Sequence, residues 1–108
     1  MNYILQYDEE LDLDFEIPEL DASIEEILTD TLLSNQHDIR MAMLSALHNG
    51  IEMKLDRIPV FAVKGSDFIF VLPKEEYSSQ LDKSIAYFSN LEEYETCSDL
   101  AKLKELLP

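Results

Sequence analysis

Residues 58–72 read IPVFAVKGSDFIFVL and carry the clearest structural signal in the chain. Two runs of β-branched and aromatic residues, 58–63 and 68–72, flank a short polar segment. Runs of this kind are typical of strands, and Gly65-Ser66 suits a two-residue type II′ turn. We therefore predict a β-hairpin here. Because both runs are continuously apolar, we expect burial on both faces, under helices.

The N-terminal residues also favour extended structure. Residues 2–7 (NYILQY) are β-prone, and residues 11–17 (LDLDFEI) alternate strictly. Leucine, phenylalanine and isoleucine occupy one side of this segment, and Asp12, Asp14 and Glu16 occupy the other. Period two predicts a half-buried strand ending at Pro18, although aspartate is a poor strand former and an extended arm is the alternative.

Helical signals occupy both flanks of the hairpin. Ser23 and Glu26 form an S-x-x-E capping box before a helical apolar pattern over 24–32. Ser34 or Asn35 is expected to cap a second helix that Gly50 ends in the left-handed conformation. The apolar stripe predicted for that helix comprises Ile39, Ala42, Met43, Ala46 and Leu47. Residues 51–55 alternate and predict one more strand.

Two further helices are predicted after the hairpin. The first begins at Pro73, with two glutamates favourable at its N-terminus, and Asn90 ends it. Its apolar face comprises Tyr77, Leu81, Ser84, Ile85 and Phe88. The last helix presents Tyr94, Cys97, Leu100, Ala101, Leu103 and Leu107.

The predicted fold class is α+β, in one acidic domain over residues 1–108. A small antiparallel sheet, made of the 58–72 hairpin plus flanking strands, packs with helical hairpins. Residues 1–20 form either an edge strand or an extended arm. The 108 residues, 46% of them hydrophobic, suit a single globular core.

The net charge of the chain limits the classes of molecule that it can bind. Twenty-three acidic residues face eight basic ones, giving −15, and no Lys or Arg occurs from Met1 to Ile39. Such a field repels nucleic acid and anionic membranes and attracts basic protein surfaces. We expect a protein partner and neither direct nucleic-acid nor membrane binding. A single cysteine, with no signal-peptide pattern or membrane-length apolar run, favours a cytoplasmic protein.

Catalytic and metal-binding patterns do not emerge. Asp8, Asp12 and Asp14 lack the glycine of a calcium loop, and His37 and His48 lack the paired spacings of zinc sites. Cys97 is expected to be a buried small hydrophobe. No nucleophile elbow, zinc-protease motif or phosphate loop occurs. The expectation is a protein that is not an enzyme, with no cofactor, no metal and no catalytic residue.

The C-terminal helical pair carries one resemblance. Tyr94-Glu95, Cys97-Ser98 and Leu100 resemble the core of the UVR motif of excision-repair proteins and some Clp ATPases, within residues 81–107. The chain departs from that motif at Ala101-Lys102 and Lys104. The resemblance implies a helical hairpin able to pair with a partner, and implies nothing about DNA repair. The alternative is that Tyr94, Leu100 and Leu103 close the protein's own core.

The function expected from these features is that of a small acidic non-catalytic protein-binding module, or adaptor, docking on a basic or apolar surface. The expected partner-binding residues are Asp12, Asp14, Phe15, Glu16, Ile17, Tyr94 and Leu103. One alternative is an inhibitor that mimics DNA, as phage and plasmid anti-defence proteins do, or an immunity protein or antitoxin in a basic cleft. Another is a structural subunit of a larger assembly such as a virion. The oligomeric state stays open.

Overall fold

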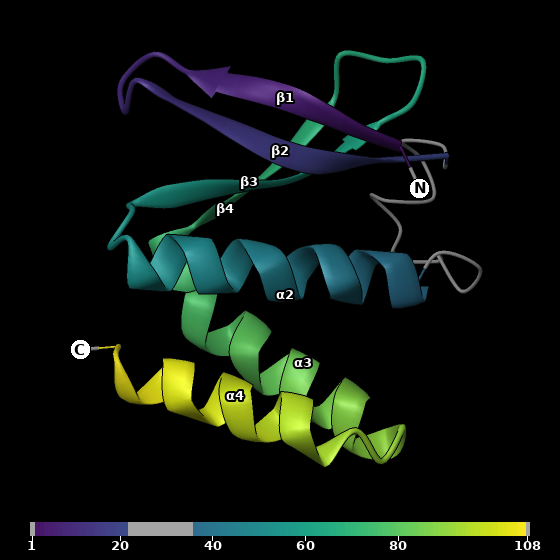
Figure 1. The fold of residues 1–108 in the computed structure, drawn as a ribbon, viewed down its shortest axis with the longest axis vertical. Coiled ribbons are helices and arrows are strands. Elements are labelled where there is room, and N and C mark those ends of the chain that lie inside the picture. Colours follow the sequence, from purple (N-terminus) through teal and green to yellow (C-terminus); the bar gives the residue numbers. More distant parts are fainter. Residues whose placement is uncertain (1, 22–35, 108) are drawn as a thin grey trace. The chain divides into compact units, whose positions relative to one another are not determined.

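The computed structural model describes residues 2–21 and 36–107 and has α+β architecture, as predicted (Figure 1). One mixed sheet has the strand order β1-β2-β3-β4. The strands are β1 (Asn2–Asp8), β2 (Leu13–Leu20), β3 (Arg57–Val63) and β4 (Ile69–Pro73). The helices are α2 (Gln36–Glu52), the 3-10 helix η1 (Lys74–Glu76), α3 (Tyr77–Asn90) and α4 (Tyr94–Glu105). The capping box, the helix over 24–32 and the cap at 34–35 lie outside the described residues.

The chain divides into two compact units. Met1–Ala42 with Pro59–Val71 forms a sheet unit, and Met43–Ile58 with Leu72–Pro108 forms a helical unit. The sheet unit holds β1, β2 and most of β3 and β4, whereas the helical unit holds α3, α4 and the C-terminal part of α2.

In the sheet unit, β1 and β2 form an antiparallel hairpin with seven register pairs, from Asn2↔Glu19 to Asp8↔Leu13. The alternation predicted for β2 is confirmed, because Phe15 and Ile17 are buried while Asp14 and Glu16 are exposed. The residues of β2 are thus a strand and not a free arm.

The prediction that Pro18 ends this strand is wrong. The strand continues to Leu20, and Pro18 pairs in register with Tyr3. Proline cannot donate a backbone hydrogen bond, so it fits a strand only where no ladder bond needs its N–H. The register pairs of β2 with β3 involve Glu19 and Leu20, so Pro18 lies just outside that ladder.

The sheet is mixed and not antiparallel throughout. Strand β2 pairs in parallel with β3, through Glu19↔Ala62 and Leu20↔Val63, and the Lys64 N–H donates to the Leu20 carbonyl at 2.8 Å. Parallel neighbours need a crossover of a dozen or more residues, usually helical. Residues 21–56 supply that length and include α2.

The β3–β4 hairpin is confirmed, with a different turn. Five residues, 64–68, connect the strands instead of two. The Ser66 N–H donates to the Val63 carbonyl at 3.2 Å, so Gly65, with φ +78°, occupies the third position of the turn. Burial on both faces holds for β3 from Ile58 to Val63, but β4 lies at the sheet edge and exposes Val71.

In the helical unit, Gly50 does not end α2. The helix continues to Glu52, so the strand predicted over 51–55 is absent. The left-handed residue is Lys54, with φ 55°. The Lys54 N–H donates to the Ile51 carbonyl at 3.2 Å, and the Leu55 N–H donates to the Gly50 carbonyl at 2.9 Å. These two bonds form a Schellman cap whose left-handed position holds a lysine instead of glycine.

Gly50 has a packing role instead. A Cβ atom at this position would lie 2.7 Å from the Tyr77 Oη and 3.2 Å from the Ile58 Cγ2. The missing side chain therefore lets the buried ring of Tyr77 rest against the backbone of α2. The apolar stripe predicted for α2 is buried at Ala42, Met43, Ala46 and Leu47.

Helices α3 and α4 form the predicted C-terminal helical hairpin (Figure 1). Pro73 ends β4 and precedes η1, so α3 begins one turn later than expected. Its predicted face is buried at Tyr77, Leu81, Ser84 and Phe88. Helix α4 buries Leu100 and Leu103 but exposes Tyr94 and Ala101.

We predict that Gly50→Ala destabilises the protein, although alanine is the better helix former. Overpacking against Tyr77 should cost about 1–3 kcal/mol, which exceeds the gain of roughly 0.5–1 kcal/mol from helix propensity. Urea unfolding measures the difference. The exposed neighbour Asn49 provides the control, because Asn49→Ala should stay within about 0.5 kcal/mol of the parent protein. Stabilisation by Gly50→Ala would contradict the close approach of Tyr77.

We also predict that Lys54→Gly stabilises the protein. The left-handed conformation costs a non-glycine residue roughly 1–2 kcal/mol, and glycine avoids that cost. The flexibility of glycine in the unfolded chain offsets part of the gain, so a net effect near 0.5–1 kcal/mol is expected, on the order of known glycine effects. The matched control is Lys102→Gly inside α4, which should destabilise by about 1 kcal/mol. If both variants changed the free energy of unfolding in the same direction, the left-handed conformation of Lys54 would be refuted.

Candidate protein-binding surface

One face of the β1–β2 hairpin carries the most exposed large hydrophobic side chains among the described residues of the sheet unit. Tyr3, Leu5 and Tyr7 are 57%, 71% and 50% exposed, respectively. Directly opposed residues of an antiparallel pair project from the same face. The register pairs Leu5↔Glu16 and Tyr7↔Asp14 therefore place two exposed carboxylates beside the apolar row. We call these five residues the hairpin face.

The turn that joins β1 to β2 uses its own carboxylates. The Asp8 Oδ1 accepts from the Glu10 N–H at 3.0 Å and from the Leu11 N–H at 3.2 Å. Asp12 takes a left-handed conformation, φ 51°, which aspartate tolerates better than most residues. The Tyr7 Oη donates to the Asp12 Oδ1 at 2.7 Å. Asp8 and Asp12 thus hold the turn, which leaves Asp14 and Glu16 as the outward carboxylates of β2.

The acidic turn changes the titration of Tyr7. The hydrogen bond to Asp12 raises the pKa of the Tyr7 phenol above its ordinary value of 10.0, with smaller contributions from desolvation and from the charges of Asp14 and Asp8. Each of these effects disfavours a phenolate among carboxylates. Tyr7 therefore stays protonated and keeps donating to Asp12 at neutral pH.

The residues expected from the sequence to bind a partner separate by burial. Asp12, Asp14 and Glu16 are exposed beside or on the hairpin face, and Tyr94 is 64% exposed at the start of α4. The side chains of Phe15, Ile17 and Leu103 are buried and do not reach the surface. For Phe15 and Ile17 the reason is the period of two, which sends alternate residues of one strand to opposite faces.

The sequence pattern alone does not identify Tyr3, Leu5 and Tyr7 as surface residues. In residues 2–7 the alternate set also contains an isoleucine, so hydrophobicity alone does not say which side faces water. The structure resolves this through the partner strand, because Ile4 pairs with the buried Ile17 while Leu5 pairs with the exposed Glu16. The alternation of β2, combined with its pairing to β1, is therefore the signal that predicts which residues of β1 face water.

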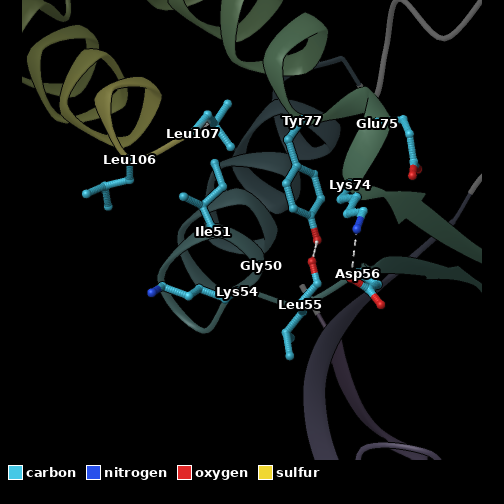
Figure 2. Close-up of a pocket in the computed structure, with 10 residues that line it drawn as sticks. All are labelled: Gly50, Ile51, Lys54, Leu55, Asp56, Lys74, Glu75, Tyr77, Leu106 and Leu107. Atoms are coloured by element: carbon cyan, nitrogen blue, oxygen red, sulfur yellow. Dashed lines mark hydrogen bonds and ion pairs between the residues drawn. The ribbon is translucent and has the colours of Figure 1, made fainter.

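The helical unit contains a pocket of about 490 Å³ (Figure 2). It is lined by Gly50, Ile51, Lys54, Leu55, Asp56, Lys74, Glu75, Tyr77, Leu106 and Leu107. Its polar groups largely serve the protein's own contacts. As Figure 2 shows, the Tyr77 Oη points to the Leu55 carbonyl, at 2.9 Å, and the Lys74 Nζ points to the Asp56 Oδ1, at 3.2 Å.

Tyr77 is a structural residue of this pocket. Burial raises the pKa of its phenol above 10.0, and the charges of Asp56 and Glu75 add to the effect. The neutral phenol donates to the backbone carbonyl of Leu55 and so secures the segment that follows α2. Across residues 2–21 and 36–107, every buried side-chain nitrogen or oxygen has a hydrogen-bond partner.

Other reactive side chains also have contacts within the chain. The Cys97 Sγ, partly buried, donates to the Ile85 carbonyl at 3.4 Å, and the His48 Nδ1 lies 3.3 Å from the Glu52 Oε1. Among the described residues, no group of three His, Cys, Asp or Glu side chains is arranged to hold a metal ion. No helix in the same part of the chain has the length and hydropathy needed to cross a membrane.

Comparisons with known proteins gave no match to a family model, a curated protein or a solved structure. The likeness of residues 81–107 to the UVR motif stays a resemblance of a few residues. Among the described surfaces, the hairpin face combines exposed apolar side chains with carboxylates.

We predict that Asp12→Ala lowers the pKa of Tyr7 toward 10.0, because it removes the hydrogen bond and the adjacent charge. In the parent protein the raised pKa means that the contact contributes fully below pH 10.0 and is lost as pH rises through the folded-state pKa. NMR titration of the Tyr7 ring carbon from about pH 9 to about pH 12 measures this change. Asp99→Ala, in α4, is the control. An unchanged Tyr7 titration in Asp12→Ala would contradict the bond.

Proposed function

We propose that this chain is a small, non-catalytic protein-binding module whose hairpin face docks on a basic surface of a partner protein. The observation that carries the proposal is the row of Tyr3, Leu5 and Tyr7, exposed beside the carboxylates of Asp14 and Glu16. Contiguous exposed apolar side chains mark interaction sites, and tyrosine is enriched among the residues that dominate binding energy.

Charge supports the basic character of the partner. The chain carries −15, and its first lysine or arginine is Arg40, so none in β1 or β2 offsets the acidic residues there. A field of one sign accelerates encounter with an oppositely charged surface and rejects like-charged partners. In this proposal the carboxylates govern association and the apolar row governs dissociation.

A nucleic-acid mimic is the second candidate, because Asp14 and Glu16 project outward from one strand as phosphates do along a backbone. An immunity protein or antitoxin in a basic cleft would use the same carboxylates. The apolar row favours the binding module over the mimic. A cleft that binds phosphates is matched by a row of charges, and the side chains of Leu5 and the two tyrosines would interrupt that row. An assembly subunit would use the apolar row with little dependence on salt.

The proposal is tested with the immobilised chain and a lysate of its source organism, at low and high salt, with and without duplex DNA. Asp14→Lys/Glu16→Lys should slow association with the captured partner by about tenfold, and Leu5→Ser should speed its dissociation by about tenfold, roughly 1.4 kcal/mol. The controls are Asp99→Lys/Glu105→Lys, with the same charge change, and Leu106→Ser, also a strongly exposed leucine.

Each outcome bears on a different candidate. Loss of the partner in the hairpin variants alone supports the binding module. Displacement by DNA, with Leu5→Ser still binding normally, favours the mimic. A partner that binds all four variants equally would refute the role of the hairpin face. If the immobilised chain captured only further copies of itself, and kept them at high salt, the result would favour an assembly subunit.

A further inference from the structure

We infer that the partner binds by adding an extended segment to the open edge of β1, and that this segment alternates apolar residues with lysine or arginine. The inference rests on the proposed function and names its binding mode and the chemistry of its partner. Addition of a strand to a sheet edge is a recurring mode of peptide recognition, in which the main chain supplies affinity and the side chains supply specificity.

The first observation is the open edge itself. Strand β1 is terminal in the order β1-β2-β3-β4, so within the described residues its one strand neighbour is β2. Its seven residues pair with β2 without a bulge, from Asn2↔Glu19 to Asp8↔Leu13. In an antiparallel pair, alternate residues direct their N–H and C=O groups away from the partner strand. These groups of β1 form a continuous row of backbone donors and acceptors.

The second observation is that β1 itself carries no lysine, proline or bulge, three of the usual protections of a sheet edge. Sheet edges are commonly guarded by lysine, proline, bulges or short length. The sequence of β1, NYILQYD, contains neither lysine nor proline. The opposite edge, β4, has five residues and ends in Pro73. The edge at β4 is thus short and ends in proline, whereas the edge at β1 is longer and has no proline. This difference is expected if β1 pairs with another chain.

The third observation decides between a second copy and a basic partner. Two copies paired through β1 would bring together two chains that each carry −15. Net charges of the same sign repel, and this repulsion opposes self-pairing of the edge. The acidic chain attracts a basic segment and repels a second copy of itself. The segment that fits the edge of β1 is therefore a strand of a basic protein.

The two faces of β1 specify the side chains of that strand. On the hairpin face, an added strand would lie beside Tyr3, Leu5 and Tyr7, where lysine or arginine can rest on the tyrosine rings and approach the carboxylates of β2. On the other face it would lie beside Ile4, which is partly buried and pairs with the buried Ile17. Apolar residues fit that face. Alternation follows from the period of two.

The test uses the full chain and synthetic nonapeptides. The probe alternates lysine and valine, and its charge control alternates glutamate and valine. Two further lysine–valine peptides carry N-methyl groups on every lysine or on every valine, which blocks one set of backbone donors in each. Isothermal titration measures binding, and amide hydrogen exchange by NMR reports which amides of β1 become protected.

The expected result is that the lysine–valine peptide binds and the glutamate–valine peptide does not. One N-methylated peptide should bind at least tenfold more weakly, while the other keeps most of its affinity, because an edge strand bonds β1 through alternate residues. Protection should appear at alternate amides of β1. In Asp14→Lys/Glu16→Lys the affinity of the lysine–valine peptide should fall, and in Asp99→Lys/Glu105→Lys it should not.

Equal binding by both N-methylated peptides, without alternate protection in β1, would overturn strand addition while leaving a basic partner on the hairpin face intact. No binding by the lysine–valine peptide up to about 1 mM, the weak end of specific recognition, would overturn the inference and leave the proposed function to its own lysate experiment. Dimers of the chain alone at moderate salt would overturn the choice of a basic occupant.

Discussion

The pairing register of β1 with β2 is the constraint on which the N-terminal half depends. Alternate residues of β2 are apolar and acidic, so a slip of one residue would exchange Phe15 and Ile17 with Asp14 and Glu16. Burying an ionised carboxylate without a partner costs several kcal/mol at least. That penalty selects one register. The four-residue turn, held by the carboxylates of Asp8 and Asp12, is consistent with the same choice.

The register also explains why the surface combines apolar and acidic groups. Once Phe15 and Ile17 face inward, the pairing carries Ile4 inward and places Leu5 and Tyr7 outside, beside Glu16 and Asp14. Exposed carboxylates therefore lie directly beside the apolar row. In the helical unit, by contrast, carboxylates meet lysines, as in Lys104–Asp82 at 2.6 Å. Charge is thus offset locally where the chain packs helices, and accumulates where the hairpin meets water.

Local signals predicted local structure well. The hairpin strands, the face of α3 and the alternation of β2 each follow from the period of apolar residues within one segment. The predictions that were wrong concern residues whose conformation depends on contacts with a distant segment of the chain. Gly50 looks like a helix stop, yet it is glycine because Tyr77, far along the chain, packs against it. Pro18 and the parallel pairing of β2 with β3 depend on a strand about 40 residues away.

The candidate surface shows the same division. The sequence alone predicts the carboxylates at 12, 14 and 16, because one side of the alternating segment 11–17 is entirely acidic. The apolar row was not found, since both sides of residues 2–7 carry hydrophobic side chains and only the partner strand distinguishes them. Phe15 and Ile17 were assigned to the surface for the converse reason. An apolar residue beside an acidic one reads equally well as an interface contact or as the inward side of a strand.

The use of glycine further limits how this chain can bind anything. One of its two glycines lets Tyr77 approach α2, and the other serves the turn between β3 and β4. Neither is left to bring backbone N–H groups close to a ligand, as phosphate-binding loops require. The pocket of the helical unit directs its tyrosine and Lys74 to partners within the chain. In the proposed function, recognition uses side chains of the hairpin face and the backbone edge of β1, because extended structure, exposed apolar side chains and unbalanced charge coincide there.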